Sequence, residues 1–482
     1  MSITSALSVA FSGLTATSRT AEIVSSNLAN VLTEGYGPRD VVLSARTDTK
    51  GVRVHGVTRH VDTGLIADRR RADATAAQAD TRSQFLQALE RQIGLPGEPD
   101  SLSARASAFE SSLVTAASRP DEETRLRAAV DAGGQLAGAL RVTSHRIQTL
   151  RTEADAEIAS MVGSMNRTLE QVSDINRQIV VARSSGRSIA GLEDRRQVMI
   201  DRLAEAVPIA QAKRENGTVA LYTRGGAMLL DGRPVRLEFT ASNVAMPHMT
   251  AENGLLSGLR INGVEVNTSS ERGSIAGGRL AALFDVRDGL AVEAQSKVDA
   301  VARTLVERFQ DPSVDPTLAG GDAGLFTDDG AAFDPAADVG LSGRIRVNEA
   351  VDETRGGGAW RLRDGINASA PGPAGAAGLL HALESRLSLR SAIPSGELGL
   401  AERSFAGHVD SLSAMVSQDR TSADQITSFA KATRSELLAL EKEGGVDTDA
   451  EMQRLLLIER AYAANARMIQ TADEMMKTLL RI

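Results

Sequence analysis

Residues 451–482 read EMQRLLLIERAYAANARMIQTADEMMKTLLRI, and this stretch decides the fold of the chain. Its mostly apolar side chains recur at alternating spacings of three and four, the pattern of the contact face of a coiled coil. The residues on this face are Leu455, Ile458, Tyr462, Asn465, Ile469, Ala472, Met476 and Leu479. Only Asn465 among them is polar, so the pattern predicts a long helix that needs a second long helix beside it.

The first thirty residues carry the matching pattern. The same spacing runs through Ile3, Leu7, Ala10, Leu14, Thr17, Ala21, Val24, Leu28 and Val31. The Ala and Thr positions allow two helices to approach closely. We therefore predict a helix over residues 2–30 that pairs with the last helix and ends before Gly35, Gly37 and Pro38.

Composition narrows the function classes. With 482 residues the chain has room for about two to four domains, and 42% hydrophobic residues can supply a sizeable core. A net charge of -8 and only 3% aromatic residues argue against a nucleic-acid partner, which selects basic surfaces and aromatic stacking platforms. Because the chain has no cysteine, it forms neither disulfides nor thiolate zinc sites.

The sequence shows no targeting or membrane segment. The first basic residue is Arg19, and the longest markedly apolar run near the start is Val9 to Phe11, which does not fit a cleavable signal peptide. No stretch approaches the length needed to span a membrane, so we expect no membrane insertion. Composition alone therefore favours a cytoplasmic protein, unless a dedicated export route exists.

Between its two ends the chain has the periodicity of a helical bundle. The stretches with helical spacing are 63–92, 101–118, 120–133, 136–179, 192–206, 278–310 and 405–440. The helix that begins at Pro120 is expected to end at Gly133, before the longest helix starts at Leu136. So long a helix needs a long partner, which predicts an antiparallel bundle.

The period changes at Pro208, where apolar residues begin to alternate with polar ones. This alternation, and an Asn262-Gly263 pair suited to a type I′ turn, predict a small antiparallel β domain over 207–276 that folds on its own. A second, irregular insertion rich in Gly, Asp and Pro covers 311–375, with its best strand at 344–347.

The predicted fold class is therefore α+β and multidomain, with a long helical coiled-coil bundle formed by both chain ends. We predict four units: 1–62 with 445–482 as a terminal helical core, 63–206 with 277–310 and 376–444 as a helical bundle, 207–276 as the β domain, and 311–375 as the second insertion.

No catalytic or metal-binding constellation emerges. The six histidines include no pair at metal-ligand spacing on a helix, and no nucleotide-binding or nucleophile motif is present. Residues 69–71 form a run of three arginines, but Asp68 and Asp73 flank it, which favours a solvated helix face over a phosphate site. We therefore expect no enzyme activity, no cofactor and no bound metal.

A specific signature follows the first helix. Its residues are Ser25, Asn27, Leu28, Ala29, Asn30, Thr33, Gly35 and Tyr36. They resemble the amino-terminal signature of bacterial flagellar axial proteins, the family of rod, hook and hook-associated proteins, in which Ser-Asn-Asn-Ile-Ala-Asn runs into Thr-x-Gly-Tyr-x-Arg. The chain departs from this pattern at Ser26 and Leu32, and Pro38 displaces the usual arginine to Arg39.

The last helix resembles the carboxyl-terminal signature of the same family. The matching residues are Glu451-Met452, Arg460-Ala461-Tyr462, Ala464-Asn465-Ala466-Arg467, Ile469, Thr471 to Met475 and Thr478 to Leu480. Within the family, Gly97-Glu98-Pro99, Arg119-Pro120 and Leu192 to Arg196 are most similar to the hook-associated branch, which joins the hook to the filament.

The resemblance implies a structural part of the bacterial flagellum, secreted without a cleaved signal and needed for motility. It implies unfolded passage through the flagellar type III export apparatus, so that the protein is transiently cytoplasmic and finally extracellular. The implied partners are further copies in a ring, the hook protein below, a second hook-filament junction protein above and an export chaperone on the last helix. We expect both terminal segments to be mobile in the isolated chain and to become helical on assembly or chaperone binding.

The resemblance also implies which residues meet these partners. The assembly interface is expected to contain Ile3, Leu7, Leu14, Val24, Asn27, Leu28, Asn30, Gly35, Tyr36, Leu455, Ile458, Tyr462, Asn465, Ile469, Met476 and Leu479, and the chaperone site Tyr462, Ile469 and Met476. Two alternatives stay open. The chain could be another axial protein, such as the hook protein, or a secreted enzymatic or ligand-binding β domain on a helical stalk.

Overall fold

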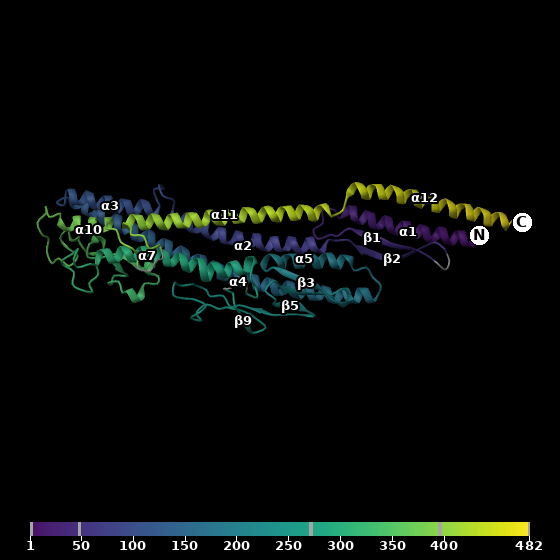
Figure 1. The fold of residues 1–482 in the computed structure, drawn as a ribbon, viewed down its shortest axis with the longest axis horizontal. Coiled ribbons are helices and arrows are strands. Elements are labelled where there is room, and N and C mark those ends of the chain that lie inside the picture. Colours follow the sequence, from purple (N-terminus) through teal and green to yellow (C-terminus); the bar gives the residue numbers. More distant parts are fainter. Residues whose placement is uncertain (1–2, 47–49, 269–272, 394–397, 481–482) are drawn as a thin grey trace.

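The computed structural model describes residues 3–46, 50–268, 273–393 and 398–480. The molecule is elongated, with both chain termini at one end and long helices running along its length (Figure 1). Helices make up 61% of it, and the strands form small antiparallel sheets. The predicted α+β class is therefore confirmed.

One end of the molecule combines segments from both ends of the chain. α1 (Ile3–Ala29) and α12 (Thr448–Leu479) lie side by side, as the two matching patterns predicted (Figure 1). A hairpin of β1 (Arg39–Ala45) and β2 (Val52–Arg59) also contacts α1. We call α1, β1, β2 and α12 the terminal core.

Eight other helices, from 8 to 62 residues long, form the bundle. They are α2 (Thr63–Ile93), α3 (Leu102–Ser118), α4 (Glu123–Ser184), α5 (Ala190–Ala206), α6 (Gly278–Asp285), α7 (Ala291–Phe309), α10 (Gly378–Ser388) and α11 (Phe405–Glu443). α11 packs along α2. A π-helical stretch over Val286–Leu290 connects α6 to α7. Asp62, Ser101 and Ser404 fix the starts of α2, α3 and α11, because each side chain accepts a backbone N–H that the helix leaves free.

The longest helix, α4, differs from the prediction. Instead of ending at Gly133, it runs through that residue and Gly134 as one helix of 62 residues. A Cβ atom on Gly133 would lie 3.1 Å from the ring of Phe109 in α3, so this glycine makes room for a neighbouring aromatic side chain. Burial along α4 outweighs the helix-propensity cost of about 1 kcal/mol for each glycine.

The described residues of the segment 207–276 form two small antiparallel sheets. The first is β3 (Ile209–Lys213), β4 (Val219–Thr223), β5 (Met228–Asp231) and β6 (Arg233–Pro234), and the second is β7 (Leu237–Glu238), β8 (Leu259–Ile261) and β9 (Val264–Val266). Asn262 and Gly263 both have positive φ, 50° and 79°, as the predicted type I′ turn requires.

Residues 311–375 are mostly irregular in the structure. β10 (Phe326–Asp328) pairs with β11 (Ile345–Val347), which lies within the strand expected at 344–347. Two helices of one turn, α8 (Leu341–Arg344) and α9 (Arg361–Asp364), interrupt the rest.

The two β sheets are attached to α4 by polar side chains. Asn176 donates to the carbonyl oxygen of Val219 at 3.0 Å, and Asn166 donates to that of Leu237 at 2.8 Å. The buried guanidinium of Arg151 donates to carbonyl oxygens of the loop between β7 and β8, at 246 and 249. The buried apolar residues of the sheets belong to the same continuous core as those of α4.

This attachment changes the expectation that 207–276 folds on its own. We expect the excised fragment to be unfolded, because its apolar residues lose the α4 surface and its carbonyl groups lose the three α4 donors. A proton–nitrogen NMR correlation spectrum of the fragment should show the narrow amide dispersion of an unfolded chain. Wide dispersion would show that the sheets carry a sufficient core themselves.

The expectation of a solvated arginine face at 69–71 is wrong for its first two residues. Arg69 and Arg70 are only 7% and 4% exposed. Arg69 forms ion pairs with Asp73 of its own helix, Asp201 of α5 and Glu441 of α11. Burial lowers the pKa of Arg69, but the three carboxylates outweigh burial and raise it. Arg69 and Arg70 therefore face the interior of the bundle, where Arg69 joins α2 to α5 and α11.

Candidate assembly interface

Small side chains allow α1 and α12 to approach each other closely. Ala10 and Ala16 of α1 and Ala472 of α12 are buried. A Cβ atom on Gly13 would lie 2.8 Å from the amide oxygen of Asn465, the one polar residue on the predicted face of α12. The missing side chain of Gly13 therefore leaves the space that this amide occupies. The spacing of apolar residues could not indicate this role.

The structure places the predicted interface residues in three environments. Val24 and Asn27 are buried. Tyr462, Met476 and Leu479 are exposed, by 47%, 41% and 61%. The others are partly buried: Ile3, Leu7, Leu14, Leu28, Asn30, Gly35, Tyr36, Leu455, Ile458, Asn465 and Ile469. The chain itself thus covers only part of the predicted contact face.

Asn27 is buried inside the terminal core of the single chain, and its predicted place at the assembly interface stays a prediction. Its amide nitrogen donates to the carbonyl oxygen of Arg39 at 2.9 Å and to the carboxylate of Glu451 at 2.8 Å. Its amide oxygen accepts from the hydroxyl group of Tyr36 and from the backbone N–H of Arg39. These bonds fix the turn from α1 to β1 against the first turn of α12. The signature residues therefore organise the terminal core from within.

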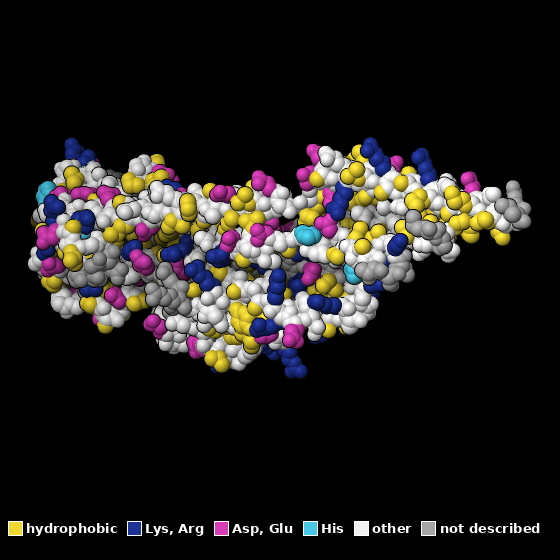
Figure 2. Space-filling model, turned by 45° about the vertical axis from the view of Figure 1, so that its right-hand side comes forward, with side chains coloured by type: hydrophobic (Ala, Val, Ile, Leu, Met, Phe, Trp, Pro, Cys, Tyr) yellow, Lys and Arg dark blue, Asp and Glu magenta, His cyan; other side chains and the backbone are white. Residues whose placement is uncertain are grey.

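Exposed apolar side chains of the terminal core lie both on the predicted contact faces and outside them. Figure 2 shows hydrophobic side chains spread along this end of the molecule. The exposed ones on α1 and the residues that follow it are Phe11, Val31 and Leu32, and those on α12 are Met452, Leu456, Leu457, Tyr462, Met468, Met475, Met476 and Leu479. A helix that is apolar on several sides is normally enclosed by neighbours. The consecutive leucines at 455–457 were the available sequence signal.

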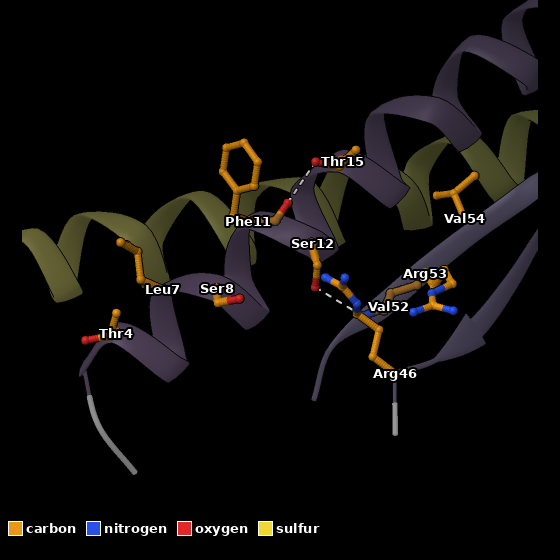
Figure 3. Close-up of a pocket in the computed structure, with 10 residues that line it drawn as sticks. All are labelled: Thr4, Leu7, Ser8, Phe11, Ser12, Thr15, Arg46, Val52, Arg53 and Val54. Carbon is orange, nitrogen blue, oxygen red and sulfur yellow. Dashed lines mark hydrogen bonds between the residues drawn. The ribbon is translucent and has the colours of Figure 1, made fainter. Parts of the chain in front are cut away.

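A shallow groove runs between α1 and the hairpin (Figure 3). Leu7 and Phe11 line one side of it, and Val52 and Val54 line the other, together with the basic side chains at 46 and 53. The hydroxyl group of Ser12 holds the two walls together, because it accepts a hydrogen bond from the backbone N–H of Val52 at 3.1 Å. The groove is an open, mainly apolar surface.

The described residues hold no candidate metal site. They include no group of three or more His, Asp or Glu side chains arranged to hold a metal ion. In the same part of the chain, no helix is both long and apolar enough to cross a lipid bilayer. On α12 the pKa of Lys477 is raised by its hydrogen bond to Asp473, an exposed pair one helical turn apart. What the site offers is apolar contact area.

Comparison with known families agrees with this geometry. Residues 7–36 match the family described as flagella basal body rod protein, and residues 442–482 match the carboxyl-terminal family of flagellar basal body rod FlgEFG proteins. The chain is thus a flagellar axial protein with its two signatures in the terminal core. Residues 72–314, half of the chain, match the helical domain of flagellar hook-associated protein FlgK. The chain belongs to the FlgK family of structural flagellar proteins.

Individual relatives carry the same description. Flagellar hook-associated protein 1 of Bacillus subtilis strain 168 is 23% identical over 94% of this chain and 93% of its own length. The protein of that name from Salmonella typhimurium strain LT2 is 23% identical over 53% of this chain and 51% of its own length. A solved structure of the flagellar hook junction protein FlgK from Burkholderia pseudomallei aligns with a TM-score of 0.43 at 19% identity, covering 54% of this chain and 46% of the other.

Proposed function

We propose that this chain forms the junction between hook and filament by assembling, through its terminal core, into a ring of identical subunits. The observation that carries the proposal is the incomplete enclosure of α12. Of its 32 residues, only Glu451 and Ala472 are buried. A helix of this kind gains too little from one partner to stay ordered alone, so neighbouring subunits would supply the missing contacts.

The proposed neighbours follow from this surface and from the family. The hook protein would contact the terminal core from below and a second junction protein from above, with α1 and α12 facing the hollow centre of the ring. The bundle, the β segment over 207–276 and the insertion over 311–375 would form the outer units. In this arrangement the chain ends make the contacts that build the ring, and the middle of the chain lies on the outer surface of the ring.

We also propose that an export chaperone binds α12 at Tyr462, Ile469 and Met476 before assembly. The exposure of Tyr462 and Met476, 47% and 41%, makes both side chains accessible in the free chain. Export would then pass through the flagellar type III apparatus, after a transient stay in the cytoplasm. Because the same side chains serve the chaperone and the neighbouring subunits, a subunit cannot assemble while its chaperone is bound.

A purely structural role is proposed, without catalysis. The alternative of a secreted β domain with an enzymatic or ligand-binding site would need a polar pocket formed by 207–375. Within that region, the guanidinium of Arg287 is fully buried and pairs with Asp155 of α4, and the buried carboxylate of Asp299 accepts hydrogen bonds from the backbone N–H groups of Gly340 and Ser342. The other alternative, the hook protein itself, is disfavoured by the FlgK match over the bundle.

A labelling experiment in cells tests the proposal. Electron microscopy with antibody against an epitope inserted at the exposed β turn Asn262-Gly263 should mark one narrow band where the hook meets the filament. Cells without the gene should carry hooks but no filaments and should release flagellin into the medium. Labelling along the whole hook would favour the hook-protein alternative, and filaments of normal number in the deletion strain would contradict the proposal.

A further inference from the structure

The chain crosses between the terminal core and the bundle twice. The first crossing is residues 60–62, between β2 and α2, and the second is residues 444–447, between α11 and α12. Besides these two connections, the hairpin meets the bundle at α5. The orientation of the terminal core therefore depends on a small contact region.

A single carboxylate, that of Asp194 in α5, lies at this contact. It pairs with Arg39 at the start of β1 and with Arg59 at the end of β2, the latter at 2.6 Å. It also accepts the backbone N–H of Gly37 at 3.2 Å. The Asp194 side chain is 12% exposed, and those of Arg39 and Arg59 are 17% and 9% exposed. The carboxylate of Asp194 thus attaches both strands of the hairpin, and the loop before it, to α5.

The backbone packs so closely against α5 at this contact that a side chain at position 35 would not fit. Gly35 has a φ of +74°, and a Cβ atom there would lie 2.5 Å from the side chain of Val198 in α5. The guanidinium of Arg39 also lies 4.6 Å from the ring centre of Tyr36. The family signature around Gly35 and Tyr36 is therefore the part of the terminal core that rests on α5.

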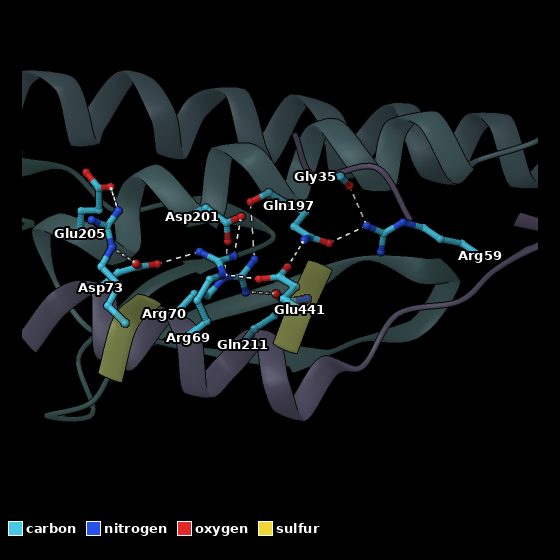
Figure 4. A network of polar contacts seen from close by, with 11 residues as sticks. Gly35, Arg59, Arg69, Arg70, Asp73, Gln197, Asp201, Glu205, Gln211 and Glu441 are labelled. Atoms are coloured by element: carbon cyan, nitrogen blue, oxygen red, sulfur yellow. Dashed lines mark hydrogen bonds and ion pairs between the residues drawn. The ribbon is translucent and has the colours of Figure 1, made fainter. Parts of the chain in front are cut away.

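The polar contacts continue from Arg59 into the bundle (Figure 4). Arg59 donates to the side-chain oxygen of Gln197 at 2.5 Å, and Gln197 donates to Glu441 at 3.3 Å. Glu441 pairs with Arg69 at 2.5 Å, and Arg69 also pairs with Asp201 at 2.8 Å. Arg59 and Arg69 lie on either side of the first crossing, and Glu441 lies just before the second. One network therefore brackets both crossings.

We propose that Asp194 and this network form an ionic joint, which holds the hairpin of β1 and β2 in one orientation relative to the bundle and so sets where α1 and α12 become ordered on assembly. The arginines at 39 and 59 lose their shared carboxylate if Asp194 is neutralised, and these two mostly buried cations then gain free energy by turning into water. The covalent crossings would remain, so the hairpin would change its orientation relative to the bundle while the bundle stays folded. Asp194 is in this sense a positioning residue.

The absence of cysteine makes the joint directly measurable in the full chain. Thr58→Cys in the hairpin and Ser428→Cys in α11, both exposed positions, take spin labels for distance measurement by pulsed electron paramagnetic resonance. The label is placed on the hairpin, not on α1 or α12, so that mobility of the terminal helices does not enter the result. The joint predicts one narrow distance distribution in the parent chain, and a broad, shifted one after Asp194→Asn.

Two further variants keep this test decisive. Asp174→Asn removes an equally sized acid from an exposed pair with Arg177 on α4 and should leave the distribution narrow. The double variant Arg39→Gln with Arg59→Gln removes both cations and changes no residue of the bundle. It should broaden the distance distribution even if Asp194→Asn disturbs α5. A narrow, unshifted distribution in this double variant, with helix content unchanged, would overturn the proposal. Because the measurement uses the free chain, its result does not depend on whether the chain assembles into a junction.

Discussion

Replacing Ile469 and Met476 together with Asp is expected to abolish filament attachment while the bundle stays folded. Ile469 is partly buried and Met476 is 41% exposed in the isolated chain, so the substitutions disturb little that the chain holds by itself. In an assembled ring the same positions would be enclosed, where each uncompensated charge costs about 3–5 kcal/mol. Electron microscopy of the variant cells should show hooks without filaments, and export into the medium should fall where the chaperone uses this face.

The control for this variant is a pair of polar residues on the same helix. Gln470→Asp with Thr478→Asp adds the same charge at exposed positions of α12 and should leave the filaments in place. Circular dichroism of both purified variants should match the parent chain. Fully flagellated cells carrying the Ile469 and Met476 substitutions would mean that this face of α12 belongs to no interface.

Replacing Phe109 with Ala is expected to cause the largest loss of stability in the bundle. Phe109 is fully buried and packs edge-on against Phe326, with ring centres 5.5 Å apart, and against Phe309 at 6.0 Å. Removing an enclosed aromatic ring costs about 3–5 kcal/mol, because the lost contacts leave a cavity. Urea unfolding followed by circular dichroism should therefore show a clearly lower midpoint.

Phe429 provides the matched comparison for Phe109. It lies on α11 and is 77% exposed, so Phe429→Ala should change the free energy of unfolding by less than about 0.5 kcal/mol. Equal midpoints for the two variants would show that the aromatic cluster around Phe109 does not hold α3, α4 and α7 together.

The sequence predicted most helices and the pairing of the chain ends, because both depend on local periodicity. The turn at Asn262-Gly263 was predictable for the same reason, since its backbone angles are set by two residues. The faces of α12 were harder to assign, because apolar residues at 455–457 point to several sides of one helix. Periodicity alone cannot say which of those sides the chain covers itself.

Long-range polar partners were beyond the reach of the sequence pattern. Arg69 was expected to face solvent because Asp68 and Asp73 are its neighbours in the chain, but two of its partners are Asp201 and Glu441 on other helices. Asn27 appeared as a signature residue, and only the structure shows that it joins α1 to Glu451 of α12. Asp194 was noted within a family-like motif, yet its pairing with the hairpin needs the three-dimensional fold.

Hydrogen exchange tests most directly the claim that the terminal core is completed by neighbouring subunits. In the free chain, residues 3–30 and 448–480 should exchange far faster than α4, because few of their side chains are buried. In isolated hook-filament junctions the same residues should become as protected as α4. Terminal helices already as protected as the bundle in the free chain would contradict the account, since they would then belong to a self-sufficient core.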